Sequence, residues 1–210
     1  MDDFTEENLR NNCPHCDSDS FASKYPLEES NNFRVVCDVH PLIEGHILII
    51  PKKHLSCIGK YSESDYLEFL SLFTKYSDFI KKTYGSVSTF EHGKIGQTVF
   101  HSHVHLLPFN GSPTQIIPEG LNSLVSFSNL SHLKDAYLKE GKYLYFSIAD
   151  QKWTVNTDLG SPGFFRDRFA KALKVPERGN WKDMDRNIDI MEKATTEIKK
   201  LQKKWKLYKQ

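Results

Sequence analysis

Three histidines alternate with smaller residues in the segment His101-Ser102-His103-Val104-His105. A neutral imidazole carries one lone pair and one N–H, so it can attack phosphorus when its other nitrogen donates to a fixed acceptor. A neighbouring imidazole can donate to phosphate oxygens or protonate a leaving group. In a strand, side chains alternate between faces, so His101, His103 and His105 would share one face while Val104 packs on the other. The spacing favours phosphoryl chemistry.

Two other interpretations of the three histidines stay open. The first is a strand that happens to carry three polar residues. The second is a three-histidine metal site, but alternate residues of a strand lie about 6.6–7 Å apart, which makes it awkward for all three to bind one ion.

A second motif with possible chemistry is Cys13-Pro14-His15-Cys16. Two cysteines at this spacing indicate half of a tetrahedral zinc site or a redox dithiol. The same four residues form the active site of a family of periplasmic disulfide oxidases, which need a strand before the motif and an export signal. Here the motif follows the polar residues 7–12. Cys37 and Cys57 have no evident partner and are expected to be buried thiols.

The elements that position these residues follow from hydrophobic pattern and turn residues. Ser62 begins a capping box, apolar residues recur at helical spacing from Leu67 to Ile80, and Gly85 stands where a C-terminal cap belongs. The expected strands before residue 110 are Phe33–Val39, His46–Ile50, Val87–Glu91 and Thr98–Leu107.

Beyond Pro108 the chain changes character, because residues 109–120 are rich in Pro, Gly and Ser. We expect a mixed set of elements after them: a helix over Ser131–Glu140, a hairpin of Tyr143–Ile148 and Lys152–Val155, an amphipathic helix over Phe164–Leu173 and a long helix over Met184–Leu207.

The chain from about Phe33 to Pro108 resembles the histidine triad (HIT) superfamily of nucleotide hydrolases and transferases. The matching motifs are Asp38-Val39-His40-Pro41, the run from Gly45 to His54, and the run from Gly96 to Pro108. The resemblance implies an α+β fold, with an antiparallel five-stranded sheet and a long helix, often paired into a homodimer. We accordingly expect a nucleotide-binding catalytic domain over 1–110, with a C-terminal extension, 111–210, packed on it.

The resemblance also implies roles for individual residues. His103 would attack the α-phosphate of a nucleotide and form a nucleotidyl-histidine, and His105 would contact the phosphate and assist the leaving group. Asp38 matches a position that binds ribose hydroxyls, although a turn aspartate is the alternative. Gln97 matches a residue that reaches the phosphates. Phe33, Ile47 and Ile49 would line a base pocket, with core packing as the alternative.

One departure concerns the turn before the Gly96-Gln97 pair. Many members of the superfamily carry an asparagine there, whereas this chain has Glu91-His92-Gly93. Either Glu91 or His92 takes over the missing phosphate contact, or the substrate differs.

Some members of the superfamily hold a structural zinc ion, and the matching ligands here are Cys13, Cys16, His54 and His101. Four such ligands with no open position describe a closed, structural site. His101 would then bind zinc while His103 does the chemistry. The alternative is a pair of reduced surface thiols and an incidental His54. Magnesium would be bound only together with a polyphosphate substrate.

Composition sets limits on the partners. A net charge of +1 does not indicate binding to nucleic acid, and no apolar run has the roughly 18 residues of a membrane span. The acidic start, Met1–Glu7, does not resemble a signal peptide, so a cytoplasmic location is expected.

Dinucleoside polyphosphates are the favoured substrates, since the extension could hold a second nucleoside. A nucleotidyltransferase or phosphorylase, a non-catalytic nucleotide-binding module and a thiol oxidoreductase are the alternatives. In the extension, some cations could reach distal phosphates, or could simply form solvated helix faces, and Trp181 could stack on a base. These cations are Arg166, Arg168, Lys171, Arg178 and Lys182.

Overall fold

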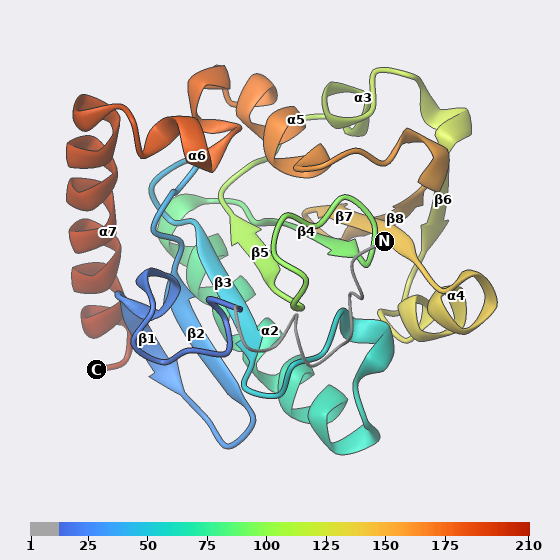
Figure 1. Ribbon diagram of the computed structural model, residues 1–210, viewed down its shortest axis with the longest axis horizontal. Helices are drawn as coiled ribbons and strands as arrows, with labels where there is room; N and C mark the ends of the chain where they lie inside the picture. Colours follow the sequence, from blue (N-terminus) through green and yellow to red (C-terminus); the bar gives the residue numbers. More distant parts are fainter. Residues whose placement is uncertain (1–12) are drawn as a thin grey trace, which may run out of the picture.

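The computed structural model describes residues 13–210, and its centre is one eight-stranded sheet in the order β1-β2-β3-β5-β4-β7-β8-β6 (Figure 1). Neighbouring strands are all antiparallel. The segment Met1–Glu7, on which the signal-peptide argument rests, lies outside the described residues. The strands are β1 (Pro26–Glu29), β2 (Phe33–Cys37), β3 (Ile47–Pro51), β4 (Ser88–Gly93), β5 (Val104–Leu107), β6 (Leu124–Phe127), β7 (Tyr143–Ile148) and β8 (Gln151–Val155).

The helices cover both faces of this sheet (Figure 1). They are α2 (Glu63–Tyr84), α3 (Pro113–Ile116), α4 (His132–Glu140), α5 (Phe164–Ala172), α6 (Trp181–Met184) and α7 (Ile188–Tyr208). The predicted ends of α2 are confirmed: the Ser62 side chain accepts a hydrogen bond from Asp65 N, and Gly85 adopts φ 87°, a conformation that favours glycine.

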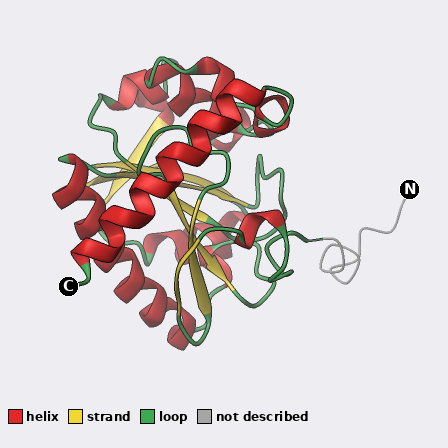
Figure 2. Ribbon diagram, turned by 90° about the vertical axis from the view of Figure 1, so that its left-hand side faces the viewer, coloured by secondary structure: helices red, strands yellow, loops and turns green. Residues whose placement is uncertain are grey.

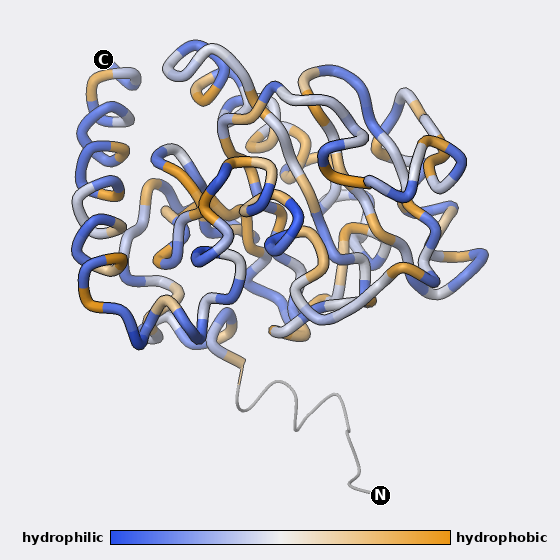
Figure 3. The backbone as a smooth tube through the Cα atoms, turned by 90° about the horizontal axis from the view of Figure 1, so that it is seen from above, coloured by the Kyte–Doolittle hydropathy of each residue, from blue (hydrophilic) through white to orange (hydrophobic). Residues whose placement is uncertain are grey.

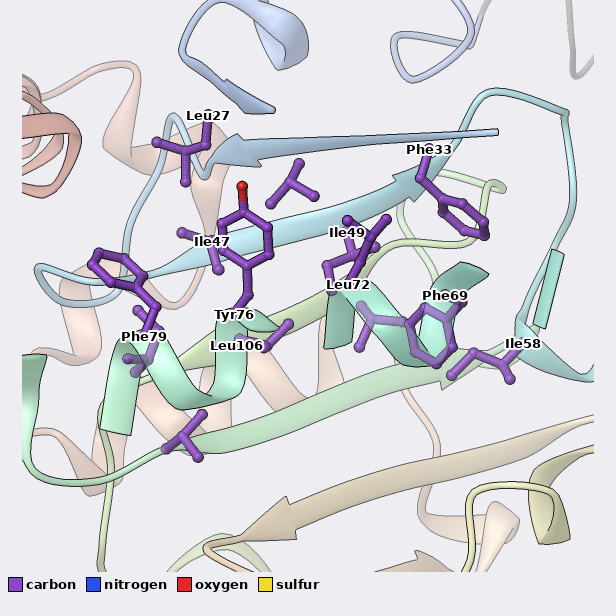
Figure 4. Packing of buried hydrophobic residues seen from close by; sticks show 14 of the residues in the cluster. Leu27, Phe33, Ile47, Ile49, Ile58, Phe69, Leu72, Tyr76, Phe79 and Leu106 are labelled. Carbon is purple, nitrogen blue, oxygen red and sulfur yellow. The ribbon is translucent and has the colours of Figure 1, made fainter. Parts of the chain in front are cut away.

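One face of the first strands packs on α2 (Figure 4). Ile47 and Ile49 of β3 point toward this helix, together with Phe33 of β2 and Leu106 of β5. The helix α7 lies along the outside (Figure 2), and its Trp205 ring stacks 4.5 Å from Tyr76 of α2, measured between centroids. Figure 3 shows hydrophilic and hydrophobic positions alternating along α7, as expected for a helix with one buried face.

The opposite face of the sheet packs on α5. Phe90 of β4 lies 5.1 Å from Phe169 and 5.5 Å from Phe165, between ring centroids. Because residues directly opposite each other in a sheet share a face, the pairing of His105 with Leu48 and with Phe90 puts His105 on this side. The extension therefore covers the face that carries His105.

The sheet is larger than the expected five strands. Strands β2 to β5 correspond to the four strands expected before residue 110, and β7, β8 and β6 continue the sheet beyond β4. An uncovered edge strand would leave its backbone N–H and C=O groups unpaired. Strand β4 is not such an edge, because β7 pairs with it along all six of its residues, Ser88–Gly93. The short edge strands β1 and β6 were missed, because four residues carry too little pattern. A domain boundary at residue 110 stays a prediction.

The prediction of one strand over Thr98–Leu107 is wrong in its first half, because β5 begins only at Val104. Residues 97–103 form a loop, in which Ser102 N donates to Leu55 O at 2.6 Å and His101 N donates to Val99 O at 2.8 Å. Only His105 lies in a strand, so simple alternation does not explain how the three histidines are placed. The last helix also begins later than predicted, because α6 is separate from α7.

Glu91 holds this loop to the sheet. Its carboxylate is fully buried and accepts hydrogen bonds from Ser102 Oγ at 2.6 Å, from Ile58 N at 3.1 Å and from the Tyr143 hydroxyl. Burial raises the pKa of Glu91 to about 7, although the three hydrogen bonds act in the opposite direction. Glu91 is therefore a structural anchor of the histidine loop.

This raised pKa predicts a pH-dependent stability. The folded protein holds the Glu91 proton up to about pH 7, whereas the unfolded chain releases it near 4.5, so stability falls as pH rises through this range. Between pH 5 and 8 the unfolding free energy should fall, relative to Glu91→Gln, by about 2.5 kcal/mol. Urea unfolding at each pH measures this, with the exposed Glu140→Gln as control. A difference that does not vary with pH contradicts the assignment.

Candidate functional site

The ring of His103 is held in one tautomer. Its Nδ1 lies 2.6 Å from the carbonyl oxygen of His101. A carbonyl can only accept, so Nδ1 carries the hydrogen and Nε2 carries the lone pair. Burial lowers the pKa of His103, which keeps the ring neutral. His103 is only partly exposed and lines a pocket. This is the state in which an imidazole can act as a nucleophile.

The ring of His105 is held in the opposite tautomer by hydrogen bonds that run through His46. Leu42 N donates to His46 Nδ1 at 3.1 Å, so His46 carries its hydrogen on Nε2. That nitrogen donates to His105 Nδ1 at 2.8 Å, which leaves the hydrogen of His105 on Nε2. Within residues 13–210, His105 Nε2 has no hydrogen-bond partner. Burial lowers the pKa of His105 and brings that of His46 to about 4, so both rings are neutral.

Both rings line one pocket. Their centroids lie 5.0 Å apart and their planes meet at 65°, so the two imidazoles are close enough to act on one phosphate group. The pocket holds about 490 Å³ of empty space, part of it open to solvent. It is lined by His15, Phe21, Ala22, Asp38, Val39, His40, Leu48, Thr98, Val99, His103, His105, Arg166 and Trp181.

Asp38 lies in this pocket as predicted, but it is already paired. Its carboxylate accepts from His40 N at 2.9 Å and from Arg166 Nη1 at 2.8 Å. Burial alone would raise the pKa of Asp38, but the charge of Arg166, the neighbouring histidines and the His40 N–H hydrogen bond together outweigh burial, and the pKa is lowered. The partner comes from α5, more than a hundred residues later in the chain.

The predicted base-pocket residues are placed elsewhere. Phe33, Ile47 and Ile49 are fully buried in the core against α2 and do not line the pocket. The reason is the alternation of β3: Leu48, between the two isoleucines, faces the other side and reaches the pocket. For these residues the alternative of core packing is the correct one.

Gln97 and His92 are held by the protein near the histidine loop. Gln97 Nε2 donates to Ser56 O at 2.6 Å, while its Oε1 is buried with no partner in the described part of the chain. His92 accepts a hydrogen bond from Phe165 N at 3.0 Å, and burial lowers its pKa to about 3. Neither residue, nor Glu91, lines the pocket, so the structure offers no replacement for the missing asparagine at these positions.

The four predicted metal ligands come together. One donor atom from each of Cys13, Cys16, His54 and His101 lies within 4.8 Å of all the others. Measured sulfur–nitrogen separations are 3.2 Å for Cys16–His54 and 3.4 Å for both Cys13–His101 and Cys16–His101. In a tetrahedral zinc site such atoms lie about 3.6 Å apart. These residues could therefore hold a zinc ion.

The second nitrogen of His101 supports this donor set. His101 Nε2 lies 2.7 Å from the carbonyl oxygen of Pro51, so Nε2 carries the hydrogen and Nδ1 offers its lone pair to the thiols. Asp38, His46 and His105 also form a compact group. A cation is disfavoured there, because the Arg166 guanidinium lies on the carboxylate and Leu42 N–H occupies the lone pair of His46.

His15, which the sequence interpretation did not select, is brought into the pocket by the Cys13–Cys16 loop. Its ring centroid lies 4.9 Å from that of His103. Its position between the two cysteines of the Cys13–Cys16 motif was the signal in the sequence that could have identified it.

The cations of the extension divide into two groups. Arg166 and Arg178 are buried, and Arg178 pairs with Glu197 of α7 at 2.7 Å. Arg168 and Lys171 pair instead with surface carboxylates, and Lys182 is exposed, as solvated helix faces would be. Trp181 lines the pocket mouth, 5.6 Å from His40 between ring centroids. Among residues 13–210, no helix has the length and apolar character needed to cross a membrane.

The first half of the chain is similar to known proteins. The HIT domain family matches residues 24–111. An uncharacterised HIT-like protein of Mycoplasma genitalium, MG132, is 30% identical over 109 residues, which cover 49% of this chain and 77% of that protein. The adenylylsulfatase HINT3 of Arabidopsis thaliana is 31% identical over 105 residues, or 48% of this chain and 53% of that protein.

A crystal structure of a HIT family protein from Bacillus anthracis is 28% identical, with a TM-score of 0.43 over 49% of this chain and 76% of that one. The chain belongs to the HIT family. It spans about half the length of the Arabidopsis relative.

Proposed function

We propose that this protein is a nucleotide hydrolase or transferase that acts at the α-phosphate through a nucleotidyl-histidine intermediate on His103. The observation that carries this proposal is the fixed His103 tautomer, with Nδ1 on the His101 carbonyl and the Nε2 lone pair available at the pocket. A neutral, oriented imidazole is the nucleophile that such a reaction requires.

The reaction would run in two displacements. First, the lone pair of His103 Nε2 attacks the α-phosphorus, a P–N bond forms, and the bond from phosphorus to the leaving group breaks with its electron pair. Water or another acceptor then attacks the same phosphorus. The P–N bond breaks, its electron pair returns to Nε2, and the nucleoside monophosphate leaves, while the acceptor gives its proton to solvent. The hydrogen on His105 Nε2 would stabilise the charge on the phosphate oxygens and assist the leaving group.

The remaining pocket residues support a nucleotide as the substrate. Asp38 offers carboxylate oxygens that would accept from ribose hydroxyls, and Trp181 offers an aromatic surface on which a base would stack. We favour dinucleoside polyphosphates and related nucleotide conjugates. Adenylyl sulfate belongs in the same panel, because the Arabidopsis relative is named an adenylylsulfatase.

The finer alternatives differ in what happens to the intermediate. A nucleotidyltransferase or phosphorylase would form the same nucleotidyl-histidine and pass it to an acceptor other than water. A non-catalytic nucleotide-binding module would bind nucleotides without forming it. A homodimer and a cytoplasmic location stay predictions from the sequence.

We also propose that Cys13, Cys16, His54 and His101 hold a structural zinc ion. Four ligands leave no open position, so the ion would fasten the N-terminal loop to the end of β3 and to the histidine loop. Zinc would thereby fix His101, whose carbonyl orients His103. Magnesium would accompany a polyphosphate substrate.

The nucleophile is tested by His103→Ala. Turnover of a nucleotide panel, including diadenosine polyphosphates and adenylyl sulfate, should fall by about 10³-fold or more, because no other group carries the intermediate. Acid quenching of the wild-type reaction should trap nucleotide covalently on the chain. The matched control is His132→Ala, which removes a histidine outside the pocket. Undiminished turnover of His103→Ala at an unchanged melting temperature refutes the assignment.

The metal cluster is tested by Cys16→Ser. Purified wild-type protein should contain about one zinc per chain, and this variant should lose it together with several kcal/mol of stability. Elemental analysis and thermal unfolding with and without a chelator measure both effects. Cys37→Ala, which removes a buried thiol outside the cluster, should keep its zinc. Equal stability of the metal-free and metal-bound proteins would rule out a structural ion.

A further inference from the structure

Three buried nitrogens without a partner meet at the same pocket. Within residues 13–210, His15 Nδ1, His105 Nε2 and Arg166 Nε make no hydrogen bond, and all three residues line the pocket. Their exposed fractions are only 6%, 2% and 7%. Buried polar atoms are rarely left unsatisfied, so three around one space indicate a ligand that supplies the missing partners.

The ligand must offer acceptors. Arg166 Nε always carries hydrogen, and His105 Nε2 carries hydrogen because His46 donates to its other nitrogen. His15 Nδ1 can carry hydrogen in one of its two tautomers. Three N–H groups around a pocket fit an anion with several oxygens, such as a phosphate group.

Of the three residues, Arg166 is the best-oriented hydrogen-bond donor, because its position is fixed. Nη1 donates to Asp38 Oδ2 at 2.8 Å, and Nη2 donates to His40 O at 2.7 Å. The guanidinium is planar, so these two bonds also fix the direction of Nε–H. Among the pocket-lining residues Arg166 is the one permanent cation, and Asp38 is the one carboxylate.

An ion pair that serves only the fold would explain part of this arrangement. It accounts for Nη1 and Nη2, but it leaves Nε buried and without an acceptor at a pocket. The neighbour Arg168 shows the difference: it forms a two-point pair with Glu119, at 2.6 and 2.7 Å, away from the pocket. Arg166 is used differently from the other arginine on the same helix.

We propose that Arg166 and His15 complete, together with His105, a three-point binding set for the substrate phosphate; this rests on the proposed function. Residues 24–111 match the HIT family, so His15 precedes the matched segment and Arg166 follows it. The Cys13–Cys16 loop and α5 thus each add one phosphate-binding residue. The ligand class is a nucleotide whose phosphate oxygens accept from these three N–H groups.

Equilibrium binding tests this without any turnover. Calorimetry compares AMP with adenosine, and GMP with guanosine, on the full-length protein. Wild type should bind the better nucleotide at least about 10-fold more tightly than its nucleoside, and Arg166→Gln should reduce this preference by about 10- to 100-fold. The control Arg168→Gln should keep the preference. Arg166→Lys, which keeps the charge but lacks the fixed Nε–H, should fall between them.

Removing Arg166 leaves Asp38 buried and unpaired, so Arg166→Gln alone can fail to fold. The double variant Asp38→Asn/Arg166→Gln removes both charges, and the ratio of nucleotide to nucleoside affinity cancels any effect on the ribose contact. His15→Phe should lower the same ratio while zinc content, measured in parallel, stays unchanged.

Two results overturn the proposal: a wild type without preference for the phosphorylated ligand, or an arginine-free variant that keeps the wild-type preference. Loss of turnover in His103→Ala is a separate measurement. A protein that shows the expected binding ratios but no covalent intermediate would overturn the catalytic proposal and leave the phosphate-binding set standing.

Discussion

The carbonyl oxygen of His101 accepts the Nδ1 hydrogen of His103 at 2.6 Å, and this one contact decides which nitrogen of His103 is left with a lone pair. The carbonyl is itself held in place, because the His101 ring is fixed on both sides, by Pro51 O at Nε2 and by the two thiols at Nδ1. A single residue, His101, therefore links the four clustered donors to the ring of His103. Any ion that tightened the four donors would also tighten the orientation of His103, without taking part in the chemistry.

The loop that carries these histidines has no ladder hydrogen bonds of its own before Val104, so other groups must hold it. Glu91 does this from β4 by accepting from Ser102 Oγ, and Leu55 O accepts from Ser102 N. Glu91 in turn receives the hydroxyl of Tyr143 from β7. Because β7 belongs to the segment beyond residue 111, the extension supports the histidine loop through the sheet, in addition to covering it with α5.

The sequence was enough to predict elements whose determinants are local. The capping residues of α2, the apolar runs of β2 and β3 and the four clustered ligands could all be found from spacing, in part through the family resemblance. Contacts between distant segments were not predictable in this way. Nothing in the run Phe164–Phe169 says that Arg166, rather than Arg168, turns inward to meet Asp38. Likewise Ile47 and Leu48 are both aliphatic, so their residue types do not show which of them faces the core. Only the face of the sheet on which each side chain lies distinguishes them.

The pairing of Asp38 with Arg166 also answers an electrostatic difficulty. Asp38 Oδ2 lies 3.9 Å from His105 Nδ1, so a carboxylate that recognised ribose would stand close to where an anionic phosphate would bind. In a buried site, two negative charges this close repel strongly. A guanidinium at 2.8 Å from the carboxylate cancels its charge and leaves the pocket neutral before substrate arrives. The surrounding histidines cannot supply that charge, because burial lowers the pKa of His46, His92 and His105. A permanent cation brought in by α5 would thus allow a carboxylate and a phosphate to share this pocket.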